Sequence, residues 1–272
     1  MRVNLSLRRL VRKIESLLNL GKTLKELSRW KKTISPLALL RELNAHVMLT
    51  RNERYVDFAE TCIYSFLHYH PNTTFTLHCD NATIGRVNSK FKKGIVDGKI
   101  LVKLLKSDDE KDWQEQKLDL ILSMTGTSDI FLDADLRWNG ALNVENGKAL
   151  FLVKEFELRD KSPFREILTQ FNNFPPHSAM KNVSVFSFGG YQLSTAEFTS
   201  VLNVMDRYRE IVDSPIVGRL DKVAVGRVIE QFALSICSEI WGTEVTYVKE
   251  SDAPMDGGIV ESCYFGATGG TF

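Results

Sequence analysis

Hydrophobic and polar positions follow two different periods in the first half of the chain. Four short apolar runs are typical of buried strands: residues 45–49, 74–79, 99–105 and 130–132. Between them, apolar residues recur at helical spacing in three segments: residues 55–69, 84–91 and 113–123. Strand and helix therefore alternate, which predicts an open and mostly parallel α/β sheet. Ligands bind beyond the carboxyl ends of the strands in such sheets, so we expect a site at that edge.

The pattern after residue 140 is less regular. Apolar runs predict strands at residues 149–153, 183–188 and 245–248. Helical spacing predicts helices at residues 163–171, 195–212 and 225–240. Because strands and helices no longer alternate there, we expect a mixed sheet and not a repeat of the first half.

The pattern of residues 1–43 predicts a basic amphipathic helical segment ahead of the main domain. Its apolar residues at helical spacing, among them Leu7, Leu10 and Ile14, are interleaved with basic residues such as Arg8. Two interpretations remain open. The segment is a helical hairpin that packs on the main domain or on a sister subunit, or it is a surface that contacts anionic lipid headgroups.

The charge of the chain is divided unevenly. Residues 1–44 hold eleven Lys and Arg against three Asp and Glu, so the rest is mildly acidic although the net charge is +1. An acidic main domain argues against nucleic acid as the main partner. The composition, with 43% hydrophobic and 25% charged residues, is otherwise that of an ordinary globular protein.

The cysteines and the lack of long apolar runs predict a cytoplasmic protein. The four cysteines are scattered without the close pairs of a zinc site or a disulfide scaffold: Cys62, Cys79, Cys237 and Cys263. No apolar run reaches the roughly 18 to 20 residues that span a bilayer. The N-terminus lacks an uninterrupted signal-peptide core. We therefore expect a cytoplasmic location, with at most a peripheral contact at the inner face of a membrane.

Two acids, Asp133 and Asp135, follow the apolar run at residues 130–132. If the strand continues through them, both side chains point to the same face. Two like charges so close need a counter-ion, and a hard divalent cation such as Mg²⁺ or Mn²⁺ would supply one and hold the phosphates of a nucleotide. The alternative is a strand that ends at a polar loop, where acids are common.

The order of several motifs resembles that of a nucleotide-sugar glycosyltransferase of the GT-A type, over roughly residues 44–265. The motifs are His-Val-Met-Leu-Thr at 46–50, the apolar run at 75–80, Lys117, Phe-Leu-Asp-Ala-Asp at 131–135, the run to Gly-Gly at 182–190 and Glu-Gln-Phe-Ala-Leu at 230–234. The resemblance implies a GT-A-like (Rossmann-like) open mixed sheet with helices on both faces. It also implies a nucleotide-binding half, residues 44–140, and an acceptor or sugar half, residues 141–272.

The resemblance implies a role for each polar group near these motifs. Asp135 would bind a divalent metal, Mn or Mg, and Asp133 the metal or the ribose; the cation would stabilise the leaving diphosphate. Further nucleotide-binding candidates are Thr50, Arg51, Asn52, Asp80 and Lys117. A polar turn for residues 50–52, a helix cap for Asp80 and a solvated Lys117 are the alternatives.

The donor-sugar candidates are Ser187, Gly189 and Gly190, for which a structural strand end is the alternative. Glu230 and Gln231 match a pair that lines the sugar pocket in the family; an ordinary surface acid is the alternative for Glu230. In an inverting enzyme a carboxylate must remove the acceptor proton. The candidates for that role are Glu230, Glu155 and Glu157.

One departure from the family concerns the metal. Many relatives place a histidine near the C-terminus as a third ligand, whereas residues 262–266 of this chain contain Cys263 and no histidine. A thiolate is a soft ligand that suits Mg²⁺ or Mn²⁺ poorly. Either water fills that position, or the metal site is weaker than in those relatives.

The function predicted from these motifs is transfer of a sugar from a nucleotide-diphosphate donor to a hydroxyl of a glycan, a lipid-linked acceptor or a protein, with a divalent metal as the only cofactor. A haloacid-dehalogenase-like phosphatase also ends a strand in Asp-x-Asp, but it expects Thr or Val where this chain has Arg137. A non-catalytic protein that binds sugar nucleotides is the third interpretation.

Overall fold

The computed structural model describes residues 42–50, 52–105, 113–142, 147–156, 180–214, 229–238, 241, 244–249 and 260–262. The amphipathic segment predicted before residue 42 and the helix predicted at 163–171 lie outside them, as do Arg51, Glu157 and Cys263. No helix in this part of the chain is long and apolar enough to cross a membrane.

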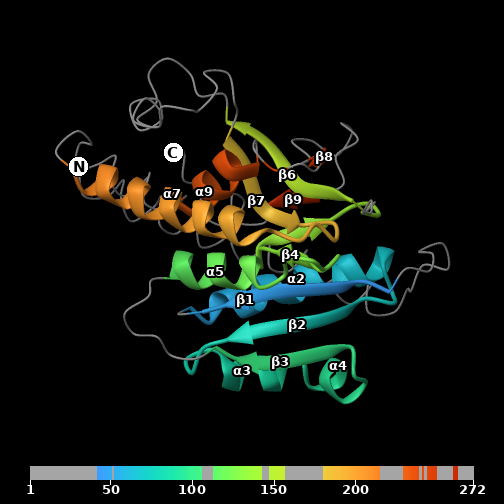
Figure 1. The fold of residues 1–272 in the computed structure, drawn as a ribbon. Coiled ribbons are helices and arrows are strands. Elements are labelled where there is room, and N and C mark those ends of the chain that lie inside the picture. The colour runs from blue at the N-terminus through green and yellow to red at the C-terminus, as the bar shows by residue number, and fades with distance from the viewer. Residues whose placement is uncertain are drawn as a thin grey trace, which may run out of the picture.

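A mixed sheet of seven strands forms the centre of the domain, in the order β3-β2-β1-β4-β7-β6-β8 (Figure 1). The strands are β1 (Asn44–Leu49), β2 (Thr74–Cys79), β3 (Ile100–Leu104), β4 (Ile130–Leu132), β6 (Lys148–Phe156), β7 (Met180–Ser187) and β8 (Glu244–Lys249). Strands β1 to β4 pair with one another in parallel, whereas β7 is antiparallel to both of its neighbours, β4 and β6. The predicted parallel first half and the predicted mixed sheet are both confirmed.

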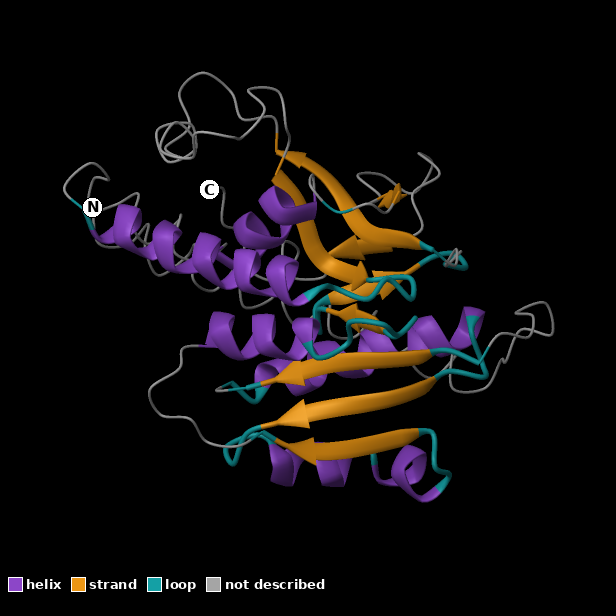
Figure 2. Cartoon of the chain, in the orientation of Figure 1, coloured by secondary structure: helices purple, strands orange, loops and turns teal. Residues whose placement is uncertain are grey.

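Helices cover both faces of this sheet (Figure 2). They are α2 (Arg54–Tyr69), α3 (Ile84–Lys90), α4 (Lys92–Val96), α5 (Trp113–Leu122), α7 (Thr195–Asp213) and α9 (Ile229–Ser238). Side chains of α2 and α3 pack with β1 to β3 in one core, and those of α5, α7 and α9 form a second core with β6 and β7. Successive side chains of β4 point to opposite faces of the sheet, so Ile130 and Leu132 pack in the first core and Phe131 packs in the second.

The order of the strands reverses between β1 and β4. The chain runs outward from β1 to β2 and β3, and then returns across α5 to place β4 on the other side of β1. In open α/β sheets the crevice at such a reversal, beyond the carboxyl ends of the strands, is where ligands bind. Asp133 follows β4 at this point.

A small second sheet lies next to the acids and was not predicted. It pairs β5 (Leu136–Trp138) with β9 (Val260–Ser262) in antiparallel register, with Leu136 opposite Ser262. Strand β5 is fastened to α2, because the Trp138 N–H donates to Ser65 Oγ at 3.0 Å and the Trp138 ring packs edge-on against Phe66. This pairing brings a segment near the C-terminus to the end of the Asp-x-Asp motif.

Candidate active site

A buried lysine joins two acids at the carboxyl end of β4. Lys117 Nζ lies 2.9 Å from Asp133 Oδ1, 3.2 Å from Asp133 Oδ2 and 3.3 Å from Glu230 Oε1. The side chains of Lys117 and Glu230 are 3% and 1% exposed, whereas that of Asp133 is 27% exposed. Asp133 is therefore the solvent-facing member of a charged cluster whose other two members are buried.

The local sequence explains how α5 delivers Lys117 to this place. Gln114, Lys117, Leu118 and Ile121 are buried at helical spacing, so the lysine occupies a position on the face of α5 that points into the core. Its ammonium lies 5.1 Å from the centroid of the Phe131 ring, a distance at which a cation and an aromatic face attract each other.

The two acids are held by different elements. The Asp133 N–H donates to the carbonyl of Ser184 on β7 at 2.8 Å, which fixes the backbone where β4 ends. Glu230 lies in the first turn of α9, where the helix dipole favours a negative charge. The cluster thus depends on the packing of α5, α9 and the β4–β7 pair.

Burial and charge act in opposite directions on this cluster. Burial lowers the pKa of the Lys117 ammonium, but the charges of Asp133 and Glu230 outweigh it and raise the pKa to about 12. Burial raises the pKa of Glu230, and the charge of Lys117 opposes that rise. Lys117 is therefore charged across the neutral pH range, and Glu230 binds a proton more readily than an ordinary glutamate.

Two buried side-chain oxygens on α9 have no hydrogen-bond partner among the described residues. They are Glu230 Oε2 and Gln231 Oε1. A buried acceptor left unpaired costs about 1 to 3 kcal/mol, so such atoms normally meet water or a ligand that carries donors. Hydroxyl groups are donors of that kind.

These findings decide two of the alternatives left open by the sequence. Lys117 is not a solvated lysine, and Glu230 is not a surface acid. Lys117, Asp133 and Glu230 were each predicted as site residues from the sequence, but their contact with one another was not predicted. A signal was present for Lys117, which shares a core-facing stripe with Leu118 and Ile121.

The expectation that both acids extend the strand was wrong. Strand β4 ends at Leu132, and Ala134 and Asp135 form a turn that leads into β5. The strand period therefore does not determine where Asp135 points. Ala134 is buried, at 5% exposed, and its methyl group packs in the first core.

The acid pair suits a hard cation by the chemistry of its ligands. Among the described residues no group of three or more His, Cys, Asp or Glu side chains could hold a metal ion. Mg²⁺, however, commonly binds through only one or two carboxylates together with substrate phosphates and water. Two carboxylates at the edge of the site therefore fit a cation that arrives with a phosphorylated substrate.

The predicted nucleotide-binding residues after β1 and β2 shape turns. Asn52 Oδ1 accepts a hydrogen bond from the Arg54 N–H at 3.0 Å, directly before α2, and the Asn52 N–H donates to the Thr50 carbonyl at 2.7 Å. Asp80 Oδ1 accepts from the Thr83 N–H at 2.9 Å at the start of α3. Asn52 and Asp80 thus have local structural roles, and their contacts with a nucleotide remain predictions.

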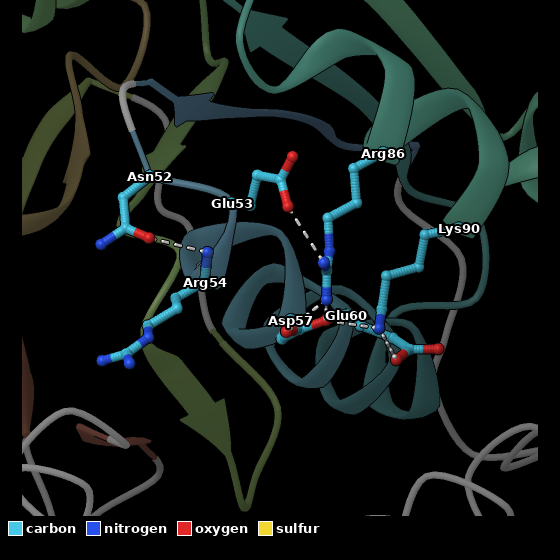
Figure 3. A network of polar contacts seen from close by, with 7 residues as sticks. All are labelled: Asn52, Glu53, Arg54, Asp57, Glu60, Arg86 and Lys90. Atoms are coloured by element: carbon cyan, nitrogen blue, oxygen red, sulfur yellow. Dashed lines mark hydrogen bonds and ion pairs between the residues drawn. The ribbon is translucent and has the colours of Figure 1, made fainter.

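A network of charged side chains fastens α3 to α2 beside this turn (Figure 3). Arg86 binds both carboxylate oxygens of Asp57, at 2.9 and 2.8 Å, and also Glu53 at 3.2 Å. Lys90 contacts Asp57 at 2.7 Å and Glu60 at 3.0 Å. Arg86 and Lys90 of α3 are thus paired with acids in α2 and at its start, so the network links the two helices and does not offer a phosphate site.

The strand end at residues 187–190 has a clear structural explanation. Ser187 Oγ accepts a hydrogen bond from the Gly189 N–H at 3.1 Å. Gly189 has φ +61°, and a Cβ there would collide with the backbone carbonyl of Lys148. The Gly190 N–H donates to the Thr127 carbonyl at 2.8 Å. Contacts of these residues with a donor sugar stay predictions, and so does the role of Glu155, whose backbone lies in β6 and whose side chain is outside the described part.

Comparison with known proteins bears on the fold. No protein-family model matches the chain, and no curated protein matches its sequence. Among solved structures, an active-site mutant of LgtC is similar with a TM-score of 0.51 and 11% identity over 81% of this chain and 86% of that chain. The galactosyltransferase LgtC in complex with donor and acceptor sugar analogs gives a TM-score of 0.48, with 11% identity over 76% of this chain and 73% of that chain. Mouse xyloside xylosyltransferase 1 gives 0.43, with 11% identity over 76% and 85%. At such identities the likeness concerns the fold, which is α/β and GT-A-like.

Proposed function

We propose that this protein transfers a sugar from a nucleotide-diphosphate donor to a hydroxyl of a glycan, a lipid-linked acceptor or a protein. The observation that supports it best is the buried cluster of Lys117, Asp133 and Glu230 beyond the carboxyl end of β4. Buried charges are costly to desolvate, and groups with perturbed pKa values gather at functional sites. The cluster lies at the reversal of the strand order, where α/β sheets bind ligands.

The chemistry of the cluster suits an anionic donor that carries hydroxyl groups. Lys117 supplies a permanent positive charge beside the place where a diphosphate would lie. Glu230 Oε2 and Gln231 Oε1 supply acceptors that need donors, and sugar hydroxyls would satisfy both. These two residues would hold the donor sugar, while Glu155 on β6 is the candidate to accept the proton of the acceptor hydroxyl.

Asp133 and Asp135 would hold the divalent metal, Mn or Mg. When bound there, the cation supplies positive charge for the diphosphate that leaves with the nucleoside. Lys117 would hold the Asp133 carboxylate in place, while the hydrogen bond from the Asp133 N–H to the Ser184 carbonyl fixes the backbone at the end of β4.

A non-catalytic protein that binds sugar nucleotides is the second candidate. The described residues offer no group of three metal-ligating side chains. This weakens the metal site and so favours a protein that binds the donor without catalysis. Such a protein would bind the donor without transferring or hydrolysing its sugar. Release of nucleoside diphosphate from a bound donor therefore separates the two functions.

Residues 1–43 belong to the same proposal. Their basic amphipathic pattern would hold a cytoplasmic enzyme at the inner face of a membrane or against a sister subunit. Flotation of the protein with vesicles of anionic and of neutral lipid tests the membrane contact. Binding to both kinds of vesicle, or to neither, contradicts an electrostatic contact with anionic lipid.

The experiment that tests the donor is a thermal-shift panel of nucleoside diphosphates and their sugars, with and without Mn²⁺. A ligand that binds only the folded state raises the unfolding temperature by mass action. We expect at least one nucleotide sugar to stabilise the protein, and to do so more strongly with Mn²⁺. Stabilisation by none of them at millimolar concentration contradicts the proposed function. Asp135→Ala should remove the metal dependence of any hit and leave the fold intact.

A further inference from the structure

The metal-binding acid already has a cation of its own. Both carboxylate oxygens of Asp133 lie within hydrogen-bond distance of Lys117 Nζ, at 2.9 and 3.2 Å. Because the ammonium is buried, water cannot replace Asp133 as its partner at low cost. A metal that approaches Asp133 therefore meets an acid that already has a positive charge beside it.

Lys117 and a divalent metal both stabilise the negative charge of Asp133 with a positive one. Two cations that share one carboxylate lie close enough to repel each other, and this repulsion is strongest where water is excluded. Glu230 also contacts the ammonium, at 3.3 Å, and so keeps it from moving away. Metal bound at Asp133 must share the acid with Lys117 or displace it.

We propose that Lys117 is a resident counter-ion that competes with the metal for Asp133, and that the diphosphate of the donor relieves this competition. The second part rests on the proposed function. Phosphate oxygens beside the site would give the ammonium another anionic partner, which frees Asp133 for the metal. Metal and donor then strengthen each other's binding, because such coupling is reciprocal. The protein alone would bind metal weakly.

The first part is tested with Mn²⁺ alone, by counting free Mn²⁺ with electron paramagnetic resonance. The decisive variant is Lys117→Met together with Glu230→Gln. It removes one positive and one negative charge, so the formal charge around Asp133 stays the same while the ion pair is lost. Glu230→Gln alone is the matched control, since it keeps Lys117 next to Asp133.

We expect the double variant to bind Mn²⁺ about tenfold more tightly than the wild type, which is the effect of losing one charged hydrogen bond. We expect Glu230→Gln to bind no more tightly than the wild type. Equal affinity of the double variant and the wild type overturns the proposal, and so does equal tightening by Glu230→Gln. If the Met variant does not fold, Lys117→Gln with Glu230→Gln replaces it, because two amides can bond each other across the gap.

The second part is tested by adding the nucleoside diphosphate that stabilises the protein in the thermal-shift panel. It should tighten Mn²⁺ binding to the wild type more than to the double variant, and equal tightening overturns this part. The Mn²⁺ measurement without nucleotide involves no sugar donor. A tighter double variant together with an empty nucleotide panel would therefore leave competition at Asp133 standing while the proposed function fails.

Discussion

Lys117 Nζ lies 2.9 Å from Asp133 Oδ1, although the two residues are on a helix and in the loop after the next strand. The contact links the interior of the second core to the edge where a ligand would bind. The structural role of the lysine can therefore be measured apart from its role in binding. Removing a buried charge should cost much more stability than removing an exposed one, because a buried partner left unpaired is costly and an exposed partner is not.

Lys117→Met should lower the free energy of unfolding by about 3 to 5 kcal/mol, because it leaves Glu230 buried without its counter-ion. Lys117→Met with Glu230→Gln should recover a large part of that loss. Urea denaturation measures both values. Lys93→Met, on the exposed surface of α4, is the control and should change stability by no more than about 0.5 kcal/mol. A single variant as stable as the double variant would contradict a charged Glu230 in the core.

Much of the fold could be predicted from the sequence because most strands are continuous apolar runs and the helices are long enough to show a period. The strand signals for β1, β2 and β4 and the helical signal of α7 were sufficient to place those elements. Strand β4 is equally short but is wholly apolar, whereas β5 has Arg137 at its centre and β9 holds only one apolar residue, so neither of these two gave a strand signal.

The site was predictable only in part, for a different reason. The Asp-x-Asp motif and Lys117 could be found locally, but their contact with Glu230 joins residues that are more than a hundred positions apart. It depends on how α9 packs against α5, which no local pattern contains. Asp135 was misplaced because β4 ends at Leu132 and a turn follows at Ala134, so the strand does not continue through the two acids.

Acid should weaken the fold through His70. Burial lowers the pKa of His70 to about 4 from 6.5, and its Nε2 accepts the Leu142 N–H at 2.8 Å, which requires the neutral ring. The unfolded chain thus binds the proton more readily, so this contribution to stability is complete above about pH 6.5 and is lost as the pH falls towards 4.

The measurement is the urea midpoint of the wild type and of His70→Gln between pH 7 and 4. The variant should lose less stability than the wild type over this interval. His78, whose pKa is lowered to about 3 by burial and by nearby positive charge, contributes in the same direction and remains in both proteins. Parallel curves for the two proteins would show that His70 is not the group that takes up the proton.

Gln231→Leu should weaken the binding of a sugar nucleotide and spare that of the nucleoside diphosphate. Its Oε1 is a buried acceptor with no donor in the part of the chain that the structure describes, and loss of one hydrogen bond to a sugar hydroxyl corresponds to about fivefold in affinity. Isothermal titration with the nucleotides found in the panel measures both affinities. Asn203→Leu on the exposed side of α7 is the control and should change neither. An equal loss for both ligands would place Gln231 at the phosphates or in the fold instead of at the sugar.

Gly189→Ala should destabilise the protein, whereas Gly85→Ala should not. Gly189 has φ +61°, and an added Cβ would collide with the Lys148 carbonyl at the start of β6, so both strain and overlap oppose the change. Gly85 lies on α3 with nothing within 4 Å of an added Cβ, and alanine favours a helix over glycine by about 0.5 to 1 kcal/mol. Gly189→Ala should lower the free energy of unfolding by about 1 to 3 kcal/mol, the usual cost of a strained residue. The urea midpoint should therefore fall for Gly189→Ala, and it should stay the same or rise for Gly85→Ala. If Gly189→Ala is as stable as the wild type but is no longer stabilised by a nucleotide sugar, the prediction is wrong. Glycine would then be needed at position 189 for contact with the donor and not for packing against Lys148.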